Sequence, residues 1–224
     1  MGSTTTAFCA VMKSGLPSAA YCFLAQQVIT GNTINGSNLI QAASSTANLA
    51  GGMSVTGSPV SGTNLLSRVL SATQLLLDSA ATASATGATL TFSADQFAMA
   101  LIKPTPTGVY GSGTTNYTNL GTNSDEVTGT GYSAGGYQWP LTSNIGPALS
   151  NNVAIWSWST NPSWTSASFS TQAGLIYSLN GLRTGVSGLA CSVEDFGGTQ
   201  TVSNGTFTVV LPSNASGTAI LRIA

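Results

Sequence analysis

The chain has 224 residues, of which 42% are hydrophobic and only 5% are charged, whereas an ordinary globular protein is about 25% charged. Its solvent-exposed surface must therefore consist mainly of Ser, Thr, Asn, Gln and Gly, and the net charge of −1 offers little electrostatic attraction for a charged partner. The few basic residues are scattered and histidine is absent, which argues against nucleic-acid binding and excludes Ser-His-Asp and Cys-His catalysis.

Residues 6–16 have the spacing of a short amphipathic helix. Apolar side chains from Phe8 to Leu16 recur at helical intervals, and Pro17 follows them. Because proline cannot continue a helix, we expect the helix to end before Pro17. The next segment, 19–29, is apolar and is compatible with a helix or a strand.

The segment 30–62 is rich in Gly, Ser, Thr and Asn, which predicts an irregular region with short elements. In Asn64–Asp78 the spacing of the apolar residues instead predicts a leucine-rich helix that packs its stripe within one subunit or between subunits. The stripe consists of Leu65, Leu66, Val69, Leu70, Leu76 and Leu77.

From about residue 89 onward, apolar and polar residues alternate with a period of two, and turn residues recur at short intervals. This pattern predicts many short strands and an antiparallel β-sandwich of the jelly-roll type. The candidate strands span 89–92, 96–102, 132–139, 153–159, 168–177, 188–196, 206–211 and 218–223. We therefore expect three parts: an N-terminal helix of the sandwich (1–22), a partly helical insertion (23–95) and the β-sandwich (96–224).

Two short motifs match catalytic signatures without their usual context. Residues 131–135 spell G-x-S-x-G, but no histidine activates Ser133 and a strand pattern follows instead of a helix. Residues 195–197 spell D-F-G without any other kinase motif. We interpret the first as a glycine-rich lead into a strand and the second as a strand end that turns through Gly197 and Gly198.

Two adjacent acid pairs, Asp125–Glu126 and Glu194–Asp195, are the candidates for glycoside hydrolysis or for binding a hard cation such as calcium. Neighbours on a strand point to opposite faces, so one pair rarely supplies two groups to one site. The simplest expectation is that these carboxylates are solvated loop charges. We predict no enzyme activity and no catalytic, cofactor-binding or metal-binding residue.

Cys9, Cys22 and Cys191 are expected to be small buried residues, with a Cys9–Cys22 disulfide left open. A group of aromatic residues in 132–164 fits a core or a subunit interface, with stacking on sugars as the alternative. The group consists of Tyr132, Tyr137, Trp139, Trp156, Trp158 and Trp164. The start of the chain lacks the pattern of an ordinary signal peptide, and no apolar run of about 18 residues predicts a membrane span.

The order of several segments across 97–223 resembles small virion structural proteins of tailed bacteriophages, of the head decoration, head fibre or minor tail type. The residues that carry this likeness lie in 97–102, 125–132, 134–136, 173–177, 195–199, 205–212 and 219–223. Residues 7–16 are similar to the short helix that opens such chains. Residues 23–95 match nothing in the family.

The resemblance implies a non-enzymatic β-sandwich with no catalytic residues to carry over. It implies a structural protein of the virion, assembled in the bacterial cytoplasm. We expect a capsid decoration, cement or head-fibre protein that is attached in many copies to the head. The expected partners are the major capsid protein or other virion proteins, together with further copies of the chain, and neither nucleic acid nor membrane. A tail, adaptor or fibre component and a carbohydrate-binding β-sandwich are the alternatives.

Overall fold

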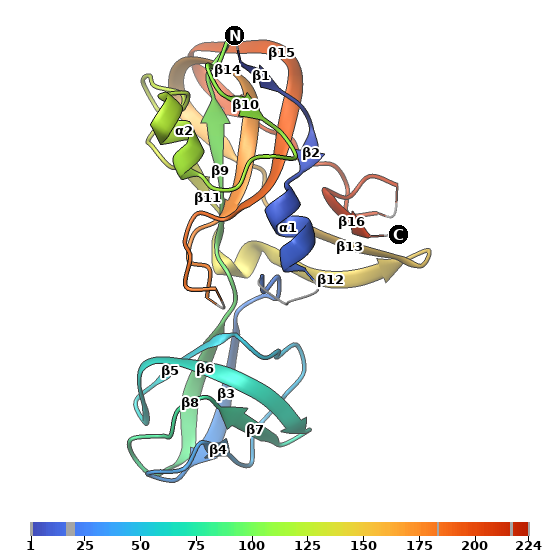
Figure 1. Cartoon of the computed structure of the whole chain (residues 1–224). Helices are drawn as coiled ribbons and strands as arrows, with labels where there is room; N and C mark the ends of the chain where they lie inside the picture. The colour runs from blue at the N-terminus through green and yellow to red at the C-terminus, as the bar shows by residue number, and fades with distance from the viewer. Residues whose placement is uncertain (1, 17–20, 183, 216, 224) are drawn as a thin grey trace. The chain divides into compact units, whose positions relative to one another are not determined.

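The computed structural model describes residues 2–16, 21–182, 184–215 and 217–223. The protein is mainly β, with antiparallel sheets and a β-sandwich-like fold, as the period-two pattern predicted. It divides into two compact units (Figure 1). The first comprises 1–21, 96–140 and 158–213, and the second comprises 22–95, 141–157 and 214–224.

A five-stranded antiparallel sheet forms the centre of the first unit. Its strands, in order across the sheet, are β11 (Tyr137–Gln138), β9 (Phe97–Ile102), β14 (Ser163–Ser178), β15 (Ala190–Thr208) and β2 (Ala7–Phe8). All of β9 is buried. A small parallel pair, β1 (Ser3–Thr4) and β10 (Val109–Tyr110), accompanies the sheet.

The long strands β14 and β15 form one curved ribbon (Figure 1). Between the pairs Thr171–Gln200 and Ala173–Asp195, β14 contributes one residue and β15 contributes residues 196–199, so β15 bulges there. We call the part beyond the bulge, 163–171 paired with 200–208, the distal ribbon. Its inner face carries buried Trp164 and Phe169, so the distal ribbon supplies an apolar layer to the sandwich-like unit.

The helix expected at 6–16 forms only in its second half, as α1 (Ala10–Gly15), because Ala7 and Phe8 belong to strand β2. Pro17 lies outside the described residues. A second helix, α2 (Thr118–Asn123), was not predicted, because Thr, Asn and Gly are poor helix formers. Neither helix is long or apolar enough to cross a membrane, a finding that covers the described residues.

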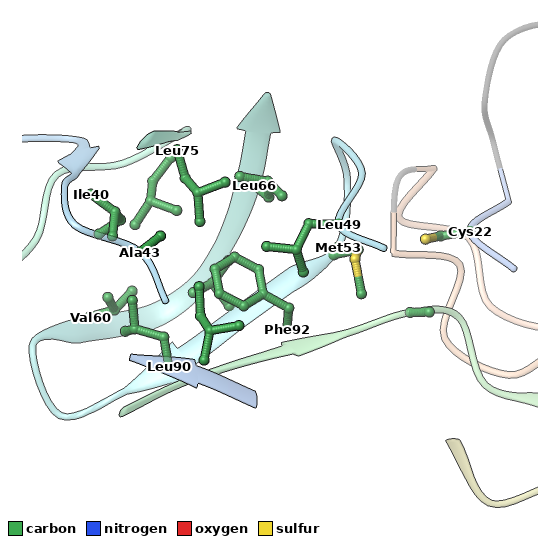
Figure 2. Packing of buried hydrophobic residues seen from close by; sticks show 14 residues of the cluster. Cys22, Ile40, Ala43, Leu49, Met53, Val60, Leu66, Leu75, Leu90 and Phe92 are labelled. Carbon is green, nitrogen blue, oxygen red and sulfur yellow. The ribbon is translucent and has the colours of Figure 1, made fainter. Parts of the chain in front are cut away.

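The second unit contains a six-stranded antiparallel sheet whose two outer strands are joined. The strands, in order, are β3 (Gln27–Thr33), β8 (Ala85–Ser93), β5 (Ser54–Gly57), β6 (Val60–Ser71), β7 (Gln74–Leu77) and β4 (Leu39–Ile40). Asn32 of β3 and Gln41, next to β4, exchange backbone hydrogen bonds of 2.7 and 3.0 Å. The sheet therefore closes into a small barrel, and Leu66, Leu90 and Phe92 point into its core (Figure 2).

The leucine-rich helix predicted at 64–78 is wrong. This segment forms β6 and β7, which pair around a two-residue turn at Ala72 and Thr73. Leu66 lies opposite Leu77, and both are buried, whereas Leu70 is exposed. A helix would have placed Leu66 and Leu70 on one face, but the barrel buries alternate leucines from two strands instead. The described residues of the insertion contain no helix, so it is not partly helical, and 30–62 holds regular strands.

A third sheet in the second unit consists of β12 (Asn144–Ser150), β13 (Val153–Trp158) and β16 (Leu221–Ile223). A 3-10 turn at Leu141–Ser143 precedes β12. Asn151 and Asn152 connect β12 to β13 with φ values of 50° and 62°, a conformation that asparagine tolerates better than most residues. Residues 141–157 and 214–224, which the sequence assigns to the sandwich, thus cluster with the second unit.

Candidate functional site

Most of the acidic side chains are directed into the protein. Among the residues whose exposure the structure describes, the exposed charged side chains are Lys13, Arg68 and Asp78. Asp95 and Asp125 are completely buried. The chemistry of each carboxylate therefore depends on the groups that hydrogen-bond to it inside the protein.

Asp125 connects the loop after β9 to the segment that follows α2. Its carboxylate accepts hydrogen bonds from the backbone N–H of Thr107 at 2.9 and 3.0 Å and of Gly108 at 2.7 Å. The hydroxyl of Tyr110 donates to it at 2.8 Å, and the ammonium of Lys103 lies 3.1 Å away. These donors satisfy both carboxylate oxygens and fix residues 103–110 in place.

Burial of Asp125 would by itself raise the pKa of its carboxyl group. The hydrogen bonds from Thr107, Gly108 and Tyr110, together with Lys103, outweigh burial and hold this pKa well below its usual value. A carboxylate with such a low pKa is a poor proton donor or acceptor near neutral pH. The expectation of a solvated loop charge is therefore wrong for Asp125, which is a buried anchor for the loop.

Glu126 lies among tyrosines, and its hydrogen-bond partners differ from those of Asp125. It accepts hydrogen bonds from the hydroxyls of Tyr117 at 2.6 Å and Tyr132 at 2.7 Å, and from the N–H of Gly135 at 2.6 Å. The hydroxyl of Tyr177 donates to the carbonyl of Gly135 at 2.8 Å, and its ring stacks on Tyr117 with 4.6 Å between centroids. Adjacent acids thus serve two separate sets of partners, as expected of an extended chain.

The tyrosines around Glu126 are neutral hydrogen-bond donors. Burial, followed by the contact with Glu126, raises the pKa of Tyr117 to about 12. Burial also raises the pKa of Tyr132 and of Tyr177. These tyrosines stay protonated at physiological pH, so they act as hydrogen-bond donors and none of them is a base.

The G-x-S-x-G segment is a loop packed against β9. Gly136 follows it with φ of 73°, and a Cβ added there would lie 1.9 Å from the carbonyl oxygen of Met99. Ser133 is exposed, and the loop leads into the short strand β11, so it lacks both the helix and the base of a hydrolase elbow. Its glycines serve close packing, which agrees with the interpretation of a lead into a strand.

The second acid pair lies in the middle of β15. Asp195 accepts hydrogen bonds from the hydroxyl of Thr4 and from the N–H of Gly197, the latter at 2.7 Å. Burial raises the pKa of Glu194. The interpretation of 195–197 as a strand end is wrong: β15 continues to Thr208, and these residues begin the bulge.

A hollow of about 370 Å³ lies beside this bulge. Its polar side chains bind one another: Gln172 donates to the Thr4 hydroxyl at 2.9 Å and accepts from the N–H of Thr105 at 3.0 Å. It is lined by Gly2, Ser3, Thr4, Thr105, Pro106, Gln172, Asp195, Gly197 and Gly198. One carboxylate among satisfied amides and hydroxyls provides no acid–base pair.

All the tryptophan side chains are buried, with at most 6% of the surface of each exposed. In the first unit they belong to a continuous chain of ring contacts, in which Trp139 stacks on Trp158 at 4.0 Å and Trp164 contacts Phe169 and Phe207. The structure therefore places the tryptophan rings in cores and offers none as an exposed platform for a sugar.

The three cysteines are buried and none of them is in a disulfide, so the Cys9–Cys22 disulfide does not form. Burial, reinforced by the charge of Glu194, raises the pKa of Cys9 to about 12. Within the described ranges, no group of three or more His, Cys, Asp or Glu side chains is placed to hold a metal ion.

The sequence analysis did not predict that Asp125 anchors a loop. The only indication in the sequence was that charged residues are scarce, so that each carboxylate stands out. The structure brings together aromatic rings, and it binds Asp125 and Glu126 to separate sets of partners. The chain matches no protein-family model, and the searches of curated proteins and of solved structures find no match.

Proposed function

We propose that this protein is a non-enzymatic structural component of a tailed-phage virion, a capsid decoration, cement or head-fibre protein attached in many copies to the head. The sequence resemblance across 97–223 suggests the class. The observation that carries the proposal is the distribution of charge: Lys13, Arg68 and Asp78 are the exposed charged side chains among those described.

A surface with so little charge is suited to repeated contacts between proteins. Burying an uncompensated charge in an interface is costly, and contacts between uncharged polar groups lose little strength in salt. When many copies occupy neighbouring sites on one particle, contacts between them raise the effective concentration at each site. Strong binding to the particle then needs only modest individual interfaces.

The acidic residues support a structural role over glycosidase activity. Asp125 anchors the 103–110 loop, Glu126 accepts from two tyrosine hydroxyls, and Asp195 is bound by Thr4 and Gly197. The burial of the tryptophans likewise favours a structural role over the carbohydrate-binding alternative. A tail, adaptor or fibre component would use the same fold and differs in its place and copy number.

Gold-labelled antibodies against the protein, applied to intact particles of the encoding phage, test the proposal. Dense label over the head is the expected result. Label confined to the tail would replace decoration with the tail or adaptor role. Particles without label, alongside a positive control antibody against the capsid protein, would refute a virion role.

A further inference from the structure

In the distal ribbon, β15 has a partner strand on one edge only. On its inner edge β15 pairs with β14 as far as Thr208. On its outer edge, the one that faces away from β14, β2 pairs only with Ser192 and Val193. Across the described parts of the chain, no strand or isolated bridge meets the outer side of 200–208. We call this stretch, Gln200 to Thr208, the open edge.

The backbone of the open edge offers hydrogen-bonding groups to solvent. The N–H of Val209 donates to the carbonyl of Pro162 at 3.0 Å, on the inner side. Because backbone groups alternate sides along a strand, the N–H and C=O groups of Thr206 and Thr208 point outward. Both threonines are exposed, so a further strand has free access to them.

Natural edges are shortened, charged, bulged, interrupted by proline or covered. The open edge carries a bulge at Ser203 and Asn204, where Asn204 has φ of 49°, and the stretch 205–208 lies beyond this bulge. Residues 196–211 contain neither a charged residue nor a proline. The other edge of this sheet, β11, is only two residues long, and the barrel joins its outer strands through Asn32 and Gln41.

We propose that the open edge pairs antiparallel with the same edge of a second copy of this chain, across a two-fold axis. This rests on the proposed function only in that several copies meet, and it names the surface through which they do so. An uncharged strand meets its own copy without like-charge repulsion, and Thr and Ser pairs are favourable across antiparallel strands. The distal ribbon already uses such pairs: Ser170 and Thr201 hydroxyls lie 2.8 Å apart, and those of Ser163 and Thr208 lie 3.0 Å apart.

Sedimentation velocity of the purified full chain over a wide concentration range tests the proposal with three variants. Thr206→Pro removes an outward N–H, and Thr206→Lys adds a charge to the edge. Thr165→Lys adds the same charge to an exposed position of β14, away from the open edge. Near-UV circular dichroism verifies that each variant is folded.

We expect the wild type and Thr165→Lys to dimerise, and both Thr206 variants to raise the dimer dissociation constant at least tenfold. Hydrogen exchange should show the Thr206 and Thr208 amides protected in the dimer and unprotected in the monomer. A wild type that stays monomeric at every concentration, or folded Thr206 variants that dimerise as well as the wild type, would overturn the proposal. Because purified protein is used, this outcome is independent of whether the protein is found on virions.

Discussion

Replacing Asp125 by alanine tests whether this carboxylate anchors the 103–110 loop. The change leaves the N–H groups of Thr107 and Gly108 without their acceptor, whereas the buried hydroxyl of Tyr110 loses one acceptor and keeps the carbonyl of Asn119 at 3.2 Å. An unsatisfied buried donor costs about 1–3 kcal/mol. Thr107 is exposed, so water replaces part of its loss, and Lys103, with 35% of its side chain exposed, contributes at most about 1 kcal/mol to the ion pair.

These contributions sum to a loss of about 2–4 kcal/mol, a large share of the ~5–15 kcal/mol that stabilises a typical domain. Urea unfolding followed by near-UV circular dichroism measures the free energy of unfolding. Asp78→Ala is the matched control, because Asp78 is exposed and its loss should change stability by no more than ~0.5 kcal/mol. A loss below about 1 kcal/mol for Asp125→Ala would refute the anchoring role.

Acidification gives a second test of the same residue. The folded protein holds the pKa of Asp125 below its unfolded value of about 3.9. The group therefore contributes stability above about pH 4, and the contribution is lost as the pH falls toward the folded pKa. The difference in unfolding free energy between the wild type and Asp125→Asn should shrink between pH 6 and pH 2.5; a difference that does not change with pH would contradict the assigned cause.

Three further outcomes are expected. Gly136→Ala should lower the free energy of unfolding by at least ~2 kcal/mol, because its Cβ would lie 1.9 Å from the carbonyl oxygen of Met99. Gly113→Ala is the control, because a Cβ there meets nothing within 4 Å. Equal effects of the two changes would contradict the close packing at Gly136. Phe92→Ala should cost about 3–5 kcal/mol in the barrel, and a calorimetric loss no larger than that of exposed Leu70→Ala would count against its place in the core. Cys9, whose pKa is raised to about 12, should resist iodoacetamide at pH 8 until urea unfolds the protein, and rapid labelling of the native thiol, located by peptide mass spectrometry, would show that it is not buried.

Only part of the strand pattern near the C-terminal end was predictable from the alternation of polar and apolar residues. The exposure of Thr206 and Thr208 and the lower exposure of Phe207 follow directly from a period of two. The strands predicted at 188–196 and 206–211 are instead one strand, β15, which ends at Thr208. The leucine-rich segment gave the wrong element because adjacent leucine pairs fit helical and strand periods alike. The pairing of Leu66 with Leu77 is a contact across a turn that contains neither glycine nor proline, so no turn residue marked it.

The structural roles of the carboxylates were only partly accessible from the sequence. Strand geometry indicated that Asp125 and Glu126 would not serve one site, and they bind separate partners. The burial of Asp125 depends on Tyr110 and on a loop that folds back over it, and such tertiary contacts leave no local pattern. Helix α2 was missed for a related reason: the burial of Leu120 offsets the weak helix propensity of its neighbours.

The copy number of this protein in purified particles of the encoding phage tests the central claim most directly. Quantitative mass spectrometry, calibrated against the major capsid protein of the same particles, measures it. The decoration role is supported by a copy number in the same range as that of the capsid protein, retained after washing in high salt. Absence of the protein from infectious particles would contradict a structural role in the virion.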